Sequence, residues 1–225
     1  RAALRALDRI DADGFAGIQP GSLNLDRIGL TGRSFGGTTT LVGLAMEPRF
    51  TSGFAVVPPG WTDPRPTLPS ETLVAGPEES VLLAATGEVA LTNMTKPTFL
   101  FSGSEDSLII GLSANMANEA GTNGPSAENP HPILRNIYET SNQSMIWGLL
   151  ADSNHATLGV SGSYWWPELK PNTQARYFEP GTIFELVDVN IAHQIQKELA
   201  LAFFNFTIRL DESAKKNLIN NQYKE

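Results

Sequence analysis

The spacing of apolar residues along the chain changes several times, and each spacing predicts a different element of secondary structure. Near the start, Leu4, Leu7 and Ile10 share one helical stripe, which predicts an opening helix. Further on, short apolar runs bounded by Gly or Pro predict buried β-strands. Four such strands are predicted, at residues 27–32, 52–60, 96–103 and 144–153.

The segments between these strands have the longer apolar period that is typical of helices. Helices are predicted at residues 35–48, 108–121 and 188–211, and a short helix or turn at 133–140. Asp188 is the predicted N-cap of the last helix, which is amphipathic. Its predicted buried face consists of Ile191, Ile195, Leu199, Ala202 and Phe206. Strands that alternate with helices predict an α/β fold with a parallel sheet.

Two stretches interrupt this alternation. Residues 61–96 are rich in proline and partly helical in pattern, and residues 156–187 are irregular and rich in aromatic side chains. Neither stretch has the composition of a linker between domains, and no internal repeat occurs in the sequence. We therefore expect a single domain over residues 1–225, with an insertion at about residues 61–96.

Composition and charge narrow the chemistry. The 225 residues carry a formal net charge of −8, which argues against a nucleic-acid-binding surface because such a surface needs clustered Lys and Arg. The absence of cysteine excludes a thiol nucleophile, a disulfide framework and a cysteine zinc site. Three histidines are too few to favour a multi-histidine metal site. No apolar run approaches the ~18 residues that a transmembrane helix needs.

Residues 32–36, Gly-Arg-Ser-Phe-Gly, match the pattern G-x-S-x-G between a predicted strand and a predicted helix. Such a chain turns sharply at Ser34, so the residues two before and two after it are expected to be small. The N–H of Phe35, at the start of the helix, can then donate to an oxyanion on a substrate carbonyl. The alternative is a glycine-rich turn in which Ser34 has no chemical role.

A serine hydroxyl becomes a nucleophile at neutral pH only with a base, which in turn needs an orienting acid. For this type of turn the expected order along the chain is serine, acid and histidine, each partner in a loop after a strand. His155 follows the fourth predicted strand, and Asp106 follows the third and is our first choice for the acid. Glu105 and then Asp152 are the alternatives for the acid.

The other two histidines fit the role of base less well. His131 lies between prolines in a loop that follows no predicted strand. His193 lies on the last predicted helix, off its apolar face, where a solvated surface histidine is expected. For His155 itself, the alternative is a purely structural role.

Together these motifs resemble the α/β-hydrolase superfamily over about residues 23–219. LDRIGLTGRSFGGTTTLVGLAMEPRF resembles the branch that holds platelet-activating-factor acetylhydrolases, dienelactone-hydrolase-like esterases and cutinase-like, polyester-cleaving enzymes. PTFLFSGSEDSLI resembles the acid loop of that branch, and LLADSNHATL resembles its histidine loop. The resemblance implies an α/β-hydrolase sheet flanked by helices and a lipase-like or cutinase-like serine esterase.

The sequence departs from that family pattern in three ways. Arg33 stands where His or Trp is more usual, and Ser34 stands where the dienelactone hydrolases proper have cysteine. In the family, several strands and the loop that gives a second oxyanion donor precede the nucleophile, whereas only one helix precedes Ser34 here. We therefore expect an N-terminal portion elsewhere, either as a separate chain from a cut precursor or as a part omitted from this sequence.

Aromatic residues are candidates for substrate contact. Trp61 follows the second predicted strand, near the point where similar polyester-cleaving enzymes carry an aromatic that stacks on an acyl or aromatic group. The alternative for Trp61 is packing under the insertion. Trp165 and Trp166 would form a lid or wall beside His155, although core packing is the preferred interpretation.

The residues and the resemblance together predict a serine hydrolase that cleaves carboxylic esters through an acyl-enzyme, with no metal or cofactor. One alternative is an amidase or peptidase with the same triad, and another is a non-catalytic hydrolase fragment that serves as a subunit of an assembly. The expected partner is a small-molecule, lipid or polymer ester, and not a nucleic acid. The compartment stays open between secreted and cytoplasmic, with secretion slightly favoured.

Overall fold

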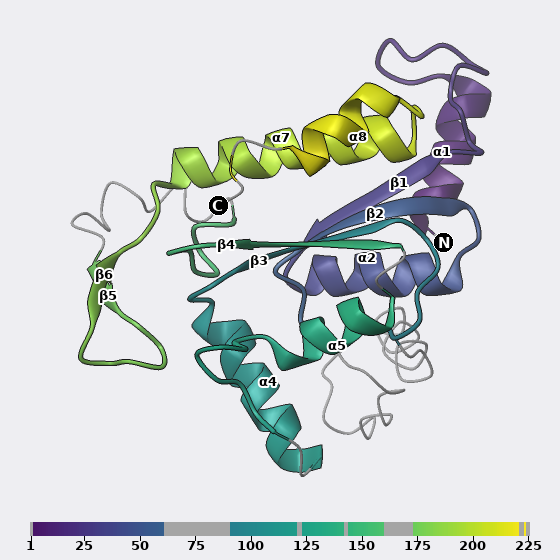
Figure 1. Cartoon of the computed structure of the whole chain (residues 1–225). Helices are drawn as coiled ribbons and strands as arrows, with labels where there is room; N and C mark the ends of the chain where they lie inside the picture. The colour runs from purple at the N-terminus through teal and green to yellow at the C-terminus, as the bar shows by residue number, and fades with distance from the viewer. Residues whose placement is uncertain are drawn as a thin grey trace.

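Four parallel strands form the central sheet of the protein, which is described from a computed structural model (Figure 1). They are β1 (Ile28–Arg33), β2 (Phe50–Val56), β3 (Thr98–Gly103) and β4 (Met145–Leu150). Their order in the sheet is β1-β2-β3-β4, so β1 and β4 are its edges within the described part of the chain. All four predicted strands are confirmed, although β2 begins earlier than predicted and ends before the prolines that follow it.

The structure describes residues 2–60, 91–120, 123–141, 144–159, 173–220 and 223. Trp61 and most of the predicted insertion at residues 61–96 lie outside these residues, and so do Trp165 and Trp166. The roles assigned to them, and the assignment of the whole chain to a single domain, stay predictions.

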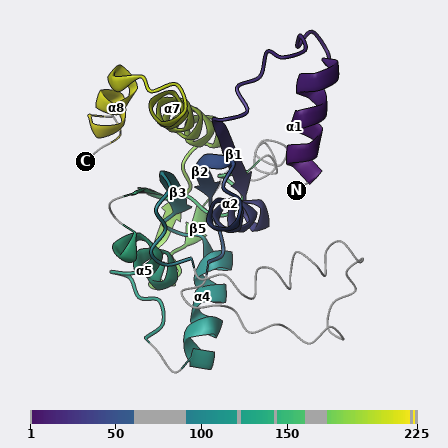
Figure 2. The same cartoon turned by 90° about the vertical axis from the view of Figure 1, so that its right-hand side faces the viewer.

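Helices cover both faces of the sheet, which confirms the α/β fold class. The described helices are α1 (Ala2–Asp13), α2 (Phe35–Met46), α4 (Ser107–Ala120), α5 (Pro132–Thr140), α7 (Val189–Thr207) and α8 (Glu212–Ile219). Figures 1 and 2 place α7 and α8 together on one side of the sheet and α2 on the other. Among the described helices, none is long and apolar enough to cross a membrane.

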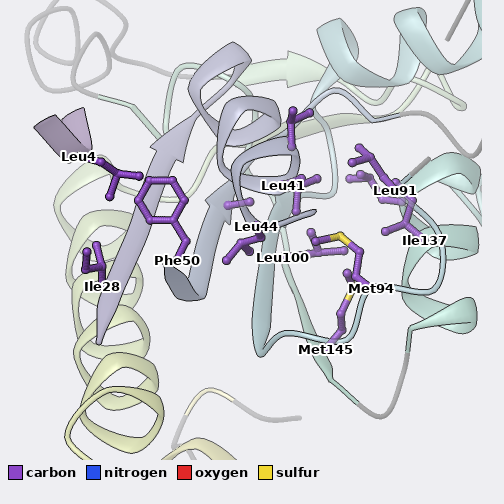
Figure 3. Close-up of a cluster of buried hydrophobic side chains, with 13 residues drawn as sticks. Leu4, Ile28, Leu41, Leu44, Phe50, Leu91, Met94, Leu100, Ile137 and Met145 are labelled. Carbon is purple, nitrogen blue, oxygen red and sulfur yellow. The ribbon is translucent and has the colours of Figure 1, made fainter. Parts of the chain in front are cut away.

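Two hydrophobic clusters lie on the two faces of the sheet, because successive strand side chains point to opposite faces. In β3, Leu100 joins the cluster under α2 and α5, whereas Phe99 and Phe101 join the cluster under α7. Figure 3 shows the first cluster, in which Leu41 and Leu44 of α2 lie near Leu100. The apolar runs that predicted buried strands are therefore explained by burial on both faces.

The buried face of α7 differs from the predicted one. The structure buries Val189, Ala192, Ile195, Leu199 and Phe203. Ile191, which was assigned to the buried face, is 52% exposed. Phe203 accounts for the difference, since its ring centroid lies 6.2 Å from that of Phe54 and 5.9 Å from that of Phe99. At 100° per residue, the centre of the observed buried face lies roughly 60° around the helix axis from the centre of the predicted face.

Two features of the C-terminal part were not predicted. β5 (Thr173–Ala175) and β6 (Ile183–Glu185) form an antiparallel hairpin inside the stretch expected to be irregular. The last predicted helix, at residues 188–211, ends earlier than predicted, because α7 ends at Thr207 and Leu210 has a φ of 58° that is incompatible with a helix. A further helix, α8, then begins at Glu212, beyond the predicted one. Asp211 caps α8 by accepting a hydrogen bond from the N–H of Ser213 (2.9 Å).

Candidate active site

Ser34 alone connects β1 to α2, because β1 ends at Arg33 and α2 begins at Phe35. Its backbone has φ 57° and ψ −123°, a conformation that residues other than glycine rarely adopt. The Ser34 N–H donates to the carbonyl oxygen of Val56 at the end of β2 (2.8 Å). The sharp turn expected from the sequence is therefore present, at the carboxyl end of the sheet.

Two glycines are required by this turn, and they are not the pair that the motif predicts. A Cβ on Gly32 would overlap the backbone of Gly36, and one on Gly37 would lie 2.9 Å from the carbonyl oxygen of Val56. A Cβ on Gly36 would have nothing within 4 Å. The expectation that both residues two positions from Ser34 must be small is right for Gly32 and wrong for Gly36.

The backbone N–H of Phe35 opens α2 immediately after Ser34. The first four N–H groups of a helix have no acceptor inside that helix, and they lie at its positive end. The N–H of Thr38 donates to the carbonyl of Ser34 (3.1 Å), which closes the first turn. The N–H of Phe35 is thus positioned beside Ser34 at the end of a helix where an anion is stabilised.

Asp106 follows β3 and caps α4. Its side chain is fully buried. Carboxylate Oδ1 accepts the N–H of Ile109 (3.1 Å), and the backbone carbonyl of Asp106 accepts the N–H of Ile110 (2.9 Å). The other oxygen, Oδ2, lies 2.8 Å from Nδ1 of His155. The helix therefore holds the carboxylate in one orientation, with one oxygen left for the imidazole.

His155 lies in the loop after β4 and is close to both other residues. Its Nε2 lies 3.0 Å from Oγ of Ser34, and its side chain is 19% exposed. The neighbouring Asn154 fixes the loop, because its Oδ1 accepts the N–H groups of Ala156 and Thr157 (both 3.0 Å). The structure thus brings Ser34, His155 and Asp106 into one hydrogen-bonded row.

Arg33 also contacts the histidine loop. Its guanidinium donates to the backbone carbonyl of His155, and a Cβ on Gly159 would overlap its side chain. Burial lowers the pKa of Arg33, while the charge of Asp106 acts in the opposite direction. The sequence indicated only that Arg33 departs from the family pattern, and the contact with His155 was not predicted.

Glu105 and Asp152, the alternatives for the acid, are both bound to Arg176. Nη1 of Arg176 lies 2.7 Å from Oε1 of Glu105, and Nη2 lies 2.8 Å from Oδ1 of Asp152. Among the described residues, the carboxylate that contacts His155 is that of Asp106. Arg176 itself was missed, because it follows a short, polar strand that has no apolar pattern.

The two remaining histidines belong to other elements, His131 to the start of α5 and His193 to α7. His131 is fully buried at the N-terminus of α5, and its Nε2–H donates to the carbonyl of Gly103 (2.8 Å). Burial lowers the pKa of His131 below its ordinary value, although the hydrogen bond to Gly103 and the charge of Asp106 oppose this effect. His193 is partly buried on α7.

A serine, a histidine and a buried aspartate in this sequence of contacts, at the carboxyl end of a parallel sheet, form the arrangement by which α/β-hydrolases are recognised. Among solved structures, the chain is similar to an esterase of Pyrococcus furiosus, with 18% identity and a TM-score of 0.41 over 92% of this chain. It is also similar to an acylaminoacyl peptidase of Pyrococcus horikoshii (14% identity, TM-score 0.40, 84% of this chain and 25% of the peptidase chain). A poly(3-hydroxybutyrate) depolymerase of Bordetella parapertussis is similar as well (19% identity, TM-score 0.36, 68% of this chain and 50% of that chain).

The chain spans 61% of the length of the Pyrococcus furiosus esterase chain. No protein-family model matches the sequence, and no curated protein matches it either. The narrower resemblance to acetylhydrolases, dienelactone-hydrolase-like esterases and cutinase-like enzymes therefore stays a prediction.

Proposed function

We propose that this protein is a serine hydrolase of carboxylic esters, with Ser34 as nucleophile, His155 as general base and Asp106 as orienting acid. One observation carries the proposal: Oγ of Ser34 lies 3.0 Å from Nε2 of His155, whose Nδ1 lies 2.8 Å from Oδ2 of Asp106. Ser34 and His155 are 121 positions apart, and Asp106 and His155 are 49 apart, so the fold makes these contacts. The buried carboxylate favours the imidazole tautomer with its proton on Nδ1, which leaves Nε2 to accept a proton.

In the first half of the reaction, Oγ of Ser34 forms a bond to the ester carbonyl carbon while its proton moves to Nε2 of His155. The carbonyl oxygen becomes an oxyanion, to which the N–H of Phe35 donates. The tetrahedral intermediate then breaks the bond to the alcohol oxygen, and Nε2–H of His155 gives its proton to that leaving group. The acyl group stays on Ser34 as an ester, and the imidazole is neutral again.

The second half repeats these steps with water as the nucleophile. His155 takes a proton from the water, whose oxygen bonds to the acyl carbon. The intermediate then breaks its bond to Oγ of Ser34, which recovers a proton from His155, and the carboxylic acid leaves. In both halves Asp106 stabilises the imidazolium without being protonated itself.

The proposal includes a second oxyanion donor beside the N–H of Phe35. The N-terminal portion expected from the family resemblance would supply it, in the same polypeptide or as a separate chain. Intact-mass measurement on the natively purified protein distinguishes the two. An active species with the mass of a longer single chain would contradict a separate N-terminal chain.

Labelling with a fluorophosphonate tests the proposed function directly, because the probe phosphonylates only an activated serine. The folded full-length protein is expected to be labelled at Ser34, as located by peptide mass spectrometry. Ser34→Ala should abolish labelling and lower ester turnover by about 10⁴-fold or more, without unfolding the protein. The exposed Ser22, in the loop before β1, provides the control Ser22→Ala, which should label like the parent. Folded protein that is not labelled would contradict the proposal and favour a non-catalytic subunit.

The choice of an ester over an amide as substrate is the finer part of the proposal. Matched ester and amide substrates with the same acyl group test it, because they differ only in the leaving group. Turnover of the ester without detectable turnover of the amide is the expected result. Comparable turnover of both would make the protein an amidase or peptidase with the same row of residues.

In this proposal Trp61 contacts the acyl group, so Trp61→Ala should raise KM for bulky acyl esters more than for acetyl esters.

A further inference from the structure

The β5–β6 hairpin is connected by polar contacts to both loops that carry the proposed acid and base. Arg176 follows β5, and its backbone N–H donates to the carbonyl of Thr182 across the hairpin (2.9 Å). Gln174 accepts a hydrogen bond from the side-chain amide of Asn154, in the histidine loop (3.3 Å). The N–H of Val187, just after β6, donates to the carbonyl of Asp152 (2.8 Å). The hairpin is therefore anchored beside the site.

Arg176 joins the two loops through a single side chain. Its Nη1 binds Oε1 of Glu105, the residue immediately before Asp106 (2.7 Å). Its Nη2 binds Oδ1 of Asp152, three positions before His155 (2.8 Å). The second oxygen of Glu105 accepts the N–H of Tyr177 (3.1 Å). One planar guanidinium thus spans the acid loop and the histidine loop, as a forked donor can and a single ammonium cannot.

The surroundings of Arg176 hold this geometry. The guanidinium carbon lies 4.5 Å from the ring centre of Phe184, which is buried together with Leu186 and Val189. The side chain of Glu105 is only 12% exposed, so few of its rotamers are free. The hydrogen bonds to Asp152 and Glu105 raise the pKa of Arg176, which keeps it charged.

We propose that Arg176 is a positioning residue that fixes the acid loop against the histidine loop and thereby sets Asp106 against His155. This proposal rests on the proposed function, because positioning has meaning only if the row of contacts is catalytic. The loops also share backbone bonds, among them Glu105 N–H to the carbonyl of Ser153 (2.9 Å). Arg176 adds a side-chain link to these backbone bonds, through Glu105 and through Asp152, whose φ of 50° is uncommon for a residue other than glycine.

The test compares Arg176→Met with Arg176→Lys in the full-length protein, with p-nitrophenyl acetate and a fluorophosphonate as probes. In Arg176→Met we expect kcat and the labelling rate to fall roughly 10- to 100-fold, because small displacements of catalytic groups reduce rates on that scale. KM should stay within about threefold, since Arg176 touches no substrate in this proposal. Arg176→Lys should recover part of kcat by binding one of the two carboxylates.

Arg49→Met is the matched control. Arg49 also pairs with a carboxylate, Asp8, and its side chain is 35% exposed against 33% for Arg176. The pair joins α1 to the start of β2, far from the row of contacts in the fold. Both Met variants should lose similar thermal stability, whereas only Arg176→Met should lose kcat.

Two outcomes separate failure of this inference from failure of the proposed function. Parent protein that is not labelled at Ser34 would overturn the function itself. Labelled parent together with unchanged kcat and labelling rate in Arg176→Met would overturn only the positioning role. If Arg176→Met does not fold, Glu105→Gln and Asp152→Asn each weaken one arm of the contact by removing the negative charge of one carboxylate. Each should lower kcat by several-fold, and their combined effect should be no larger than that of losing Arg176, because all three changes break one linkage.

Discussion

Gly32 and Gly36 occupy symmetrical places around Ser34 but have different surroundings. A Cβ at Gly32 would overlap the backbone of Gly36, while a Cβ at Gly36 would meet nothing within 4 Å. We therefore expect Gly36→Ala to keep fluorophosphonate labelling within about threefold and to leave the free energy of unfolding unchanged or raised by up to about 1 kcal/mol, because alanine favours a helix over glycine. Gly32→Ala should lose labelling and stability together. Equal effects of the two substitutions would contradict this view of the turn.

Asp106, Glu105 and Asp152 are three carboxylates with different contacts. Only Asp106 is fully buried and bound to the imidazole, while the other two bind Arg176. We expect Asp106→Asn to lower kcat by about 10⁴-fold, because an amide disfavours the imidazole tautomer that accepts the serine proton. Glu105→Gln and Asp152→Asn should each lower it by about tenfold or less, as measured with p-nitrophenyl acetate. A larger loss in Asp152→Asn than in Asp106→Asn would show that Asp152, and not Asp106, is the acid.

Single residues of the site were predictable from sequence to different degrees. Ser34, Asp106 and His155 were candidates because each follows an apolar run that predicts a strand, and the structure places each of them just after such a strand. Their catalytic roles stay a prediction. Arg33 and Arg176 could not be predicted, since their partners are a backbone carbonyl and two distant carboxylates. Such contacts depend on the conformation of loops, which cannot be predicted from the spacing of apolar residues.

Among the secondary-structure elements, length and burial decided what was predictable. β3 is buried along its whole length, and its continuous apolar run predicted a buried strand. The three-residue strands β5 and β6 were missed because a polar hairpin has too few alternations to set a period. The predicted buried face of α7 is rotated from the observed one because this helix has apolar residues outside a single stripe, such as Ile191 and Leu201, which are both more than half exposed. Packing of Phe203 against Phe54 and Phe99 selects the orientation.

In the whole molecule, parallel strand order explains why distant segments meet at one site. All four strands end at the same edge of the sheet, and the loops after β1, β3 and β4 carry Ser34, Asp106 and His155. This common edge is where ligands bind in open α/β sheets. For that reason, the order of residues along the chain could indicate that Ser34, Asp106 and His155 lie close together, although they are far apart in sequence.

Stability of the whole fold should depend on His131 as well as on the apolar core. His131 is fully buried and holds the carbonyl at the end of β3, while its Nδ1 has no partner among the described residues. Burial lowers its pKa in the folded protein below the ordinary value of about 6.5. As pH falls through about 6.5, the unfolded chain binds a proton that the folded chain does not, so the free energy of unfolding decreases. The loss ends only when the pH reaches the folded pKa.

Urea unfolding between about pH 7.5 and pH 5 measures this dependence, with His131→Gln as the comparison. Glutamine can still donate an N–H to the carbonyl of Gly103 but cannot take up a proton. The parent should lose up to about 1.4 kcal/mol per pH unit below about pH 6.5 from this group, whereas the variant should show a shallower slope. The variant is expected to be less stable than the parent at pH 7.5, because glutamine fills the buried space less well, and the difference should narrow as the pH falls. Parallel curves for the two proteins would show that folding does not shift the pKa of His131, and would exclude His131 as a cause of the pH dependence of stability.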